Sequence, residues 1–127
     1  MLAILIKAHA GLATTVVVFN TVLGLWGVIS FLRGGQRLKG NYAGALALSP
    51  ILGLVQMLIG LVFIGNGLGG AARLVHYLYG VLVVINVPAT FALTRGRDDR
   101  GMLLTYGAVL LFTAGCGIRA WMVASGR

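Results

Sequence analysis

The sequence predicts an all-α integral membrane protein: a four-helix bundle forming a single domain over residues 1–127, with the N- and C-termini on the outer side of the membrane. The first observation is composition, since 59% of the 127 residues are hydrophobic and only 9% are charged. A soluble domain carries roughly 25% charged residues, so a soluble enzyme and a free DNA-binding domain are excluded. The second observation is that polar loops divide the chain into four apolar stretches, each near the roughly 20 residues needed to cross a bilayer.

The four predicted spans follow one another with short connections. The first covers residues 8–32 after Lys7, and a basic loop over 33–42 leads to the second at 43–65. A glycine-rich turn precedes the third at 71–94, and the loop 95–101 precedes the fourth at 102–124. Backbone polar groups must be satisfied internally in lipid, which favours helices. The period-2 alternation of a membrane barrel strand is missing.

Basic residues predict the orientation of these spans. The two loops at 33–42 and 95–101 hold six of them, and the opposite side holds four: Lys7, Arg73, Arg119 and Arg127. Basic loops stay in the cytoplasm, so we expect a multi-pass protein of the bacterial inner membrane with both termini outside. This topology explains the net charge of +8 without a nucleic-acid partner.

Two absences exclude further classes. The chain has no glutamate, and its two acids, Asp98 and Asp99, lie together in a loop. Proton-coupled carriers usually depend on an acid inside a span, so that class is disfavoured. The single cysteine, Cys116, permits no internal disulfide, no CxxC metal site and no CxxCH haem attachment.

The two histidines, His9 and His76, both lie in apolar spans that start on the outer side. They therefore have a similar depth, and an antiparallel bundle can bring them face to face. Two neutral imidazoles suit haem iron, whereas zinc requires three or four ligands. A chlorophyll-type pigment, which needs one histidine per magnesium, and histidines that only hydrogen-bond between helices are the alternatives.

Other residues complete the predicted site. Arg73 and Arg119 can pair with haem propionates, although arginines near helix ends also snorkel to the surface. Tyr77 can line the pocket, and Gly80 leaves room for a flat ligand or for helix packing. Asn20 shares a helix face with His9. No internal repeat is apparent.

Two segments carry a resemblance to a known family: LVQMLIGLV at 54–62 and RLVHYLYG at 73–80. They resemble one four-helix half of a haem A synthase-type protein, a layout shared by bis-histidine membrane cytochromes of the b type. The resemblance implies that His9 and His76 bind haem b, with Gln56 and Gly60 on the helix between them. The family's catalytic half uses a glutamate that this chain lacks, so we do not expect the chain to be catalytic alone.

The expected function is therefore that of a b-type haem subunit for one-electron transfer within a larger membrane redox complex. Its partners would be the lipid bilayer, other membrane subunits, and a quinone or neighbouring redox cofactor. The alternative is a cofactor-free structural subunit of a respiratory or photosynthetic complex, or a pigment-binding subunit. A small ion channel is a minor alternative.

Overall fold

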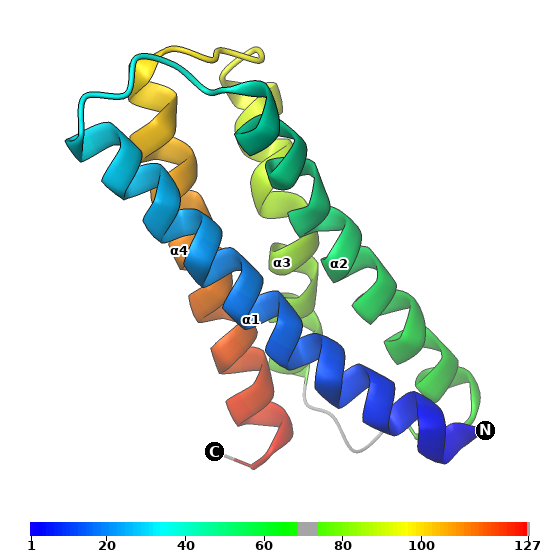
Figure 1. The fold of residues 1–127 in the computed structure, drawn as a ribbon. Helices are drawn as coiled ribbons and strands as arrows, with labels where there is room; N and C mark the ends of the chain where they lie inside the picture. The colour runs from blue at the N-terminus through cyan, green and yellow to red at the C-terminus, as the bar shows by residue number, and fades with distance from the viewer. Residues whose placement is uncertain (69–73, 127) are drawn as a thin grey trace.

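A computed structural model describes residues 1–68 and 74–126 of the chain. This part of the chain contains four helices: α1 (Leu2–Leu32), α2 (Gly40–Gly65), α3 (Leu74–Leu93) and α4 (Arg100–Ala124). The helices run up and down as an antiparallel bundle (Figure 1). Both chain ends lie at one end of the bundle, and the loops after α1 and α3 lie at the other. The predicted all-α, four-helix fold is confirmed.

All four helices are long and apolar enough to span a membrane. The predicted spans end at or within one residue of the observed helix ends, but α1 begins at Leu2 rather than at residue 8. Lys7 does not interrupt the helix, because lysine is a good helix former whose long stem carries the charge outward. The start of the third predicted span, residues 71–73, lies outside the described residues.

The outer surface of the bundle is apolar. Large hydrophobic side chains are widely exposed, including Leu74 at 72%, Phe91 at 60% and Phe112 at 59%. Soluble monomers rarely expose contiguous apolar surface on this scale. The surface therefore suits contact with lipid.

Glycines bring α1 and α4 into close contact. A Cβ atom on Gly107 of α4 would lie 2.9 Å from Val28 Cγ2 and 3.0 Å from the carbonyl oxygen of Gly24. A Cβ atom on Gly24 of α1 would likewise lie 3.0 Å from the carbonyl oxygen of Gly107. Small residues at these positions allow two membrane helices to approach at backbone distance. The contact joins a first hairpin, made of α1 and α2, to a second hairpin, made of α3 and α4.

Each hairpin also has a side-chain hydrogen bond of its own between its two helices, buried in the first hairpin and partly buried in the second. In the first, Ser49 Oγ of α2 donates to Asn20 Oδ1 of α1 over 2.6 Å. In the second, Asn86 Nδ2 of α3 donates to Thr113 Oγ1 of α4 over 2.9 Å. Asn20, Ser49 and Thr113 have no exposed surface. Such bonds between membrane helices contribute about 0.6 kcal/mol on average.

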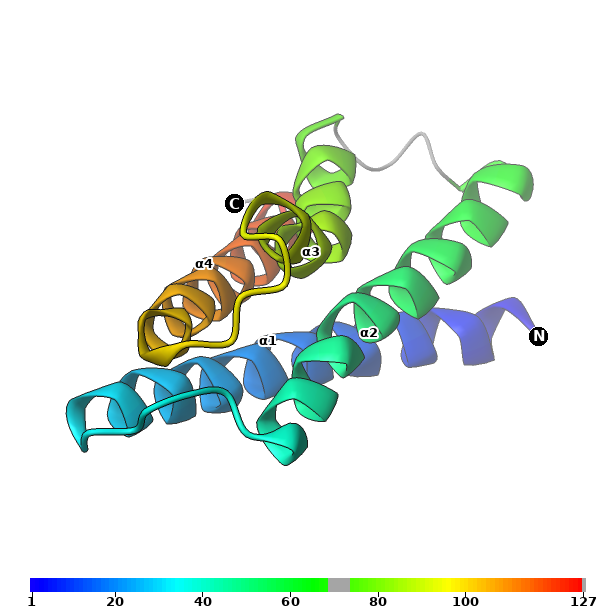
Figure 2. The same ribbon diagram turned by 90° about the horizontal axis from the view of Figure 1, so that it is seen from above.

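Interactions between the two loops close the bundle at one end. Arg100 donates from Nη1 to the carbonyl oxygens of Phe31 and Gly35, over 2.7 and 2.9 Å. Its guanidinium also lies 4.1 Å from the centroid of the Phe31 ring. Arg37 forms an ion pair with Asp98 of the other loop. Toward the end that holds the termini, the two hairpins diverge (Figure 2), and the candidate site lies there.

Candidate functional site

A cavity of about 630 Å³ lies among all four helices, near the end of the bundle that holds the termini. Its volume lies in the roughly 300–1,000 Å³ range of small-molecule and cofactor sites. The walls are almost entirely apolar, and many of the lining residues are small, among them Ala13, Gly53, Gly60, Gly80 and Gly117. Histidine side chains and one glutamine are the main polar groups in the wall. The cavity can therefore hold an apolar ligand of cofactor size.

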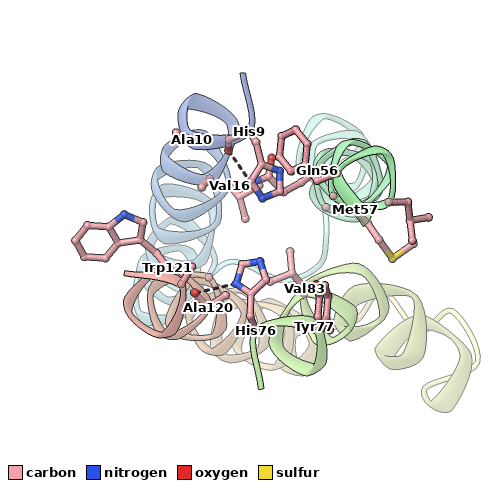
Figure 3. Close-up of a pocket in the computed structure, with 18 of the residues that line it drawn as sticks. His9, Ala10, Val16, Gln56, Met57, His76, Tyr77, Val83, Ala120 and Trp121 are labelled. Atoms are coloured by element: carbon pink, nitrogen blue, oxygen red, sulfur yellow. Dashed lines mark hydrogen bonds between the residues drawn. The ribbon is translucent and has the colours of Figure 1, made fainter. Parts of the chain in front are cut away.

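The two histidines face each other across this cavity (Figure 3). His9 comes from α1 and His76 from α3, and their ring centroids are 6.4 Å apart with an angle of 55° between the ring planes. Both side chains are partly buried. The predicted proximity of the two histidines is confirmed.

The ring of His76 is held in one orientation. Its Nδ1 lies 3.0 Å from the carbonyl oxygen of Ala120 on α4. A carbonyl oxygen only accepts hydrogen bonds, so Nδ1 carries the proton and donates. The other nitrogen, Nε2, then keeps its lone pair. Histidines that ligate metals commonly donate their second ring N–H to a backbone carbonyl in this way.

The ring of His9 lies among residues of α2. Phe63 packs edge-on against it at 5.3 Å between centroids. A Cβ atom on Gly60 would lie 3.8 Å from His9 Cε1, in ordinary contact. Gln56 Nε2 donates to the backbone carbonyl of His9 over 2.7 Å. These contacts fix the backbone of α1 at the histidine.

Two buried polar atoms of this wall have no hydrogen-bond partner in the described part of the chain. They are Nδ1 of His9 and Oε1 of Gln56. Leaving a buried polar group unsatisfied costs about 1–3 kcal/mol. Unpaired groups of this kind are typical of functional sites. Both atoms belong to residues that line the cavity, which favours a ligand role for this end of the bundle.

The two hairpins contribute equivalent residues to the cavity, although the sequence alone showed no repeat. Helices α1 and α3 each contribute three lining residues with the spacing i, i+4, i+7: His9, Ala13 and Val16 from α1, and His76, Gly80 and Val83 from α3. Each residue of the second set lies 67 positions after its equivalent in the first. Helices α2 and α4 each contribute three lining residues with the spacing i, i+3, i+7: Gly53, Gln56 and Gly60 from α2, and Gly117, Ala120 and Ala124 from α4. Each residue of the second set lies 64 positions after its equivalent in the first. Each hairpin therefore contributes one copy of the same pattern of lining positions to the cavity.

The equivalence extends below the cavity. It relates the buried residues Tyr42 and Leu46 of α2 to Tyr106 and Leu110 of α4, which are all less than 7% exposed. Ser49 and Thr113 are equivalent in the same way, and their hydroxyl groups form the hydrogen bonds with Asn20 and Asn86. Side-chain identity differs at most positions because many apolar residues serve equally well in lipid, so the repeat is visible only once the positions are placed in space.

Several predicted site residues line the cavity together. Tyr77 packs edge-on against His76, with ring centroids 5.8 Å apart. Gly80 lies one helical turn further along α3, and a Cβ atom there would meet nothing within 4 Å. Trp121 of α4 also lines the cavity. These residues form the wall on the His76 side.

Other predicted site residues lie elsewhere. Asn20 does not line the cavity, because it is eleven residues from His9, about 16 Å further along the helix. It bonds to Ser49 rather than to a ligand or to Gln56. Arg119 is exposed and does not line the cavity either, since one residue before Ala120 is about 100° around the helix. Arg73 lies outside the described residues.

Sequence reasoning did not assign two residues of the site. Ala120 holds His76 through its backbone, so its side chain gives no signal in the sequence. Phe63 is one of many apolar residues in its helix and likewise carries no signal. Gln56 and Gly60, which the resemblance puts on the helix between the two histidines, do line the cavity.

Charged side chains are concentrated at the opposite end of the bundle. Arg97 donates to Asp99 over 2.8 Å, and this hydrogen bond lowers the pKa of Asp99 and raises that of the Arg97 guanidinium. Asp98 pairs with Arg37. Because these are the two acids of the sequence, no carboxylate side chain faces the cavity.

The described residues contain no group of three or more His, Cys, Asp or Glu that could hold a metal ion. A zinc site, which needs three or four ligands, is therefore absent from this part of the chain. The histidine pair is a two-ligand set, which suits a metal whose other positions are filled by a cofactor.

Comparisons with protein-family profiles, with curated proteins and with solved structures find no match for this chain. The site is therefore interpreted from its own geometry.

Proposed function

We propose that this chain is a four-span membrane protein that binds one haem b between His9 and His76 and transfers single electrons within a larger membrane complex. One observation carries the proposal: two imidazoles face each other at 6.4 Å across an apolar cavity of about 630 Å³. The segments that resemble haem A synthase-type proteins support it.

The spacing of the rings fits a single shared metal ion. Imidazole nitrogens ligate metals at about 2 Å, and a ring centroid lies about 1.1 Å behind its nitrogen. Two imidazoles on opposite sides of one ion would therefore have centroids about 6.3 Å apart. The observed 6.4 Å agrees with this value. A chlorophyll-type pigment would use only one of the two histidines, whereas a shared haem accounts for both, so the close pair favours haem.

The chain's own residues have distinct roles in this site. Ala120 fixes His76 with Nε2 directed toward the cavity. Gln56 is the equivalent of Ala120 in the first hairpin, and its unpaired Oε1 is suited to accept the proton of His9 Nδ1. Gly80 and its equivalent Ala13 lie one helical turn after His76 and His9, and their small size leaves space in the cavity for a flat ligand.

The chemistry follows from the ligand set. A haem held by His9 and His76 would supply one-electron transfer, and with both histidines bound to it no position would be left for a substrate. The loops after α1 and α3 are short, so they offer little surface to a soluble redox partner. The electron partner in this proposal is a quinone or a cofactor of a neighbouring subunit, with the basic loops on the cytoplasmic side of a bacterial inner membrane.

The test is an absorption spectrum of the detergent-purified protein expressed with ample haem, oxidised and then reduced with dithionite. We expect a sharp reduced α-band of the b type in the wild type, lost in His9→Ala and in His76→Ala. Asn20→Ala is the matched control, since it removes a buried polar side chain outside the cavity and should keep the band.

A second arm separates loss of ligation from loss of folding. Free imidazole added to His9→Ala should restore the low-spin spectrum, because it can enter the space that the side chain leaves. A featureless spectrum from folded wild-type protein would refute the haem proposal and leave a cofactor-free structural subunit as the function.

A further inference from the structure

A second cavity, of about 320 Å³, lies at the opposite end of the bundle, where α1 ends and α2 begins. Three basic residues of the connecting loop line it: Arg33, Arg37 and Lys39. Trp26 and Tyr42 form its apolar wall, with their rings edge to face at 5.6 Å between centroids. The proposed function does not use this cavity.

The positive charge in this cavity is not balanced by the chain. Asp98 pairs with Arg37, and Asp99 pairs with Arg97 outside the cavity. Within residues 1–68 and 74–126, neither Arg33 nor Lys39 has an ion-pair partner. Lys39 also stands at the N-cap of α2, where the partial positive charge of the helix end adds to its own. The cavity therefore favours an anion.

The other loop holds this basic loop in place. Arg100 binds the carbonyl oxygens of Phe31 and Gly35, at the start of the loop. The backbone N–H of Leu38 donates to the carbonyl oxygen of Asp98 over 2.8 Å. A site whose loop is already ordered loses less entropy when a ligand binds.

The surroundings of the cavity are those of a lipid interface. Trp26 is 46% exposed, and Val22 and Ile29 lie on the same face of α1 at i−4 and i+3, 59% and 46% exposed. Tryptophan is enriched at the headgroup level of membranes. An apolar strip thus leads from the basic cavity along the part of α1 that suits contact with acyl chains.

We propose that this cavity binds the phosphate diester of an anionic phospholipid, with one acyl chain along the exposed face of α1. Arg33 and Lys39 contact the phosphate, and Trp26 packs on the glycerol region. Basic pockets between membrane helices are suited to lipid headgroups of this kind. A phospholipid can place an acyl chain along the apolar strip, whereas free phosphate makes no use of it, so the strip favours a lipid as the ligand.

Tryptophan fluorescence can test this proposal, because the chain has two tryptophans and one of them lines each cavity. In a Trp121→Phe background, Trp26 is the sole tryptophan and is excited selectively over the tyrosines. The protein is placed in bilayers that contain brominated phosphatidylglycerol or brominated phosphatidylcholine, and the quenching of Trp26 is compared. The ratio between the two lipids cancels any quenching that both samples share.

We expect brominated phosphatidylglycerol to quench Trp26 at lower mole fraction than brominated phosphatidylcholine. In the Arg33→Gln/Lys39→Gln variant, this preference should fall by about fivefold for each charge removed. Arg95→Gln is the control, since it removes a basic residue of the loop between α3 and α4 that does not line the cavity.

Three results would overturn the proposal. Equal quenching by the two lipids would show no headgroup selectivity. An equal loss in Arg95→Gln would show a diffuse surface charge rather than a site. Displacement of the lipid preference by millimolar inorganic phosphate would show that the cavity is a phosphate site with no role for the acyl chain.

Discussion

The substitution Gly80→Leu tests whether a flat ligand occupies the cavity between the histidines. Gly80 lines this cavity one helical turn from His76, and a Cβ atom there meets nothing within 4 Å. A leucine side chain can therefore enter the cavity without disturbing the protein around it. It would occupy space that the proposed ligand needs.

The expected magnitude follows from the cost of overpacking. Forcing extra methylene groups into a filled site costs about 1–3 kcal/mol, which corresponds to haem binding weakened by about 5- to 150-fold. The stability of the ligand-free protein should not fall, because glycine is a poorer helix former than alanine by roughly 0.8–1 kcal/mol and leucine ranks just below alanine. Loss of binding without loss of stability is the expected signature.

Gly115→Leu is the matched control for this experiment. Gly115 is exposed on α4, outside the cavity, and a Cβ atom there also meets nothing within 4 Å. The assay is a haem titration followed by absorbance, together with thermal unfolding of the ligand-free protein. If Gly80→Leu bound haem as tightly as Gly115→Leu does, the reasoning that places the ligand beside α3 would be wrong.

Three further outcomes are expected. Gln56→Leu should keep the b-type spectrum but raise the reduction potential, measured by redox titration, because His9 loses the acceptor that makes it a stronger donor to iron. Gly107→Ala should destabilise the bundle by about 1–3 kcal/mol in a denaturant titration, because its Cβ atom would be too close to α1. Asp99→Asn should unfold more readily than the wild type above pH 3.8, the ordinary pKa of the carboxyl, because pairing with Arg97 lowers the pKa in the folded state. That difference should disappear as the pH falls through the lowered pKa.

The fold was largely predictable from the sequence because a bilayer imposes strong constraints. The number of helices and the positions of the loops follow from where charged residues and a glycine-rich turn interrupt the apolar stretches. The meeting of His9 and His76 was predictable for the same reason, since a common depth in antiparallel helices leaves little freedom. Periodicity also placed Asn20 on an inward face, and it has no exposed surface.

The rest of the site depends on features that periodicity does not report. Periodicity predicts which side of a helix a residue lies on, but it does not predict which side chain of a neighbouring helix lies at the same depth. Asn20 was therefore expected at the ligand, whereas it forms a hydrogen bond with Ser49. Proximity along the helix axis likewise suggested Arg119, whose angular position takes it off the cavity wall. The anchor of His76 is a backbone carbonyl, which any residue at position 120 would supply.

The hydrogen bonds described between helices within the apolar region fall inside one hairpin or the other, as with Asn20–Ser49 and Asn86–Thr113. The contact between hairpins instead depends on close glycine packing, as at Gly107, and on the loops. Each hairpin can therefore form in the bilayer before the two dock. The histidines come from different hairpins, so a ligand that binds both recognises the docked state alone and shifts the docking equilibrium by mass action. A ligand of this kind would therefore stabilise the contact between the hairpins without touching the glycines that form it.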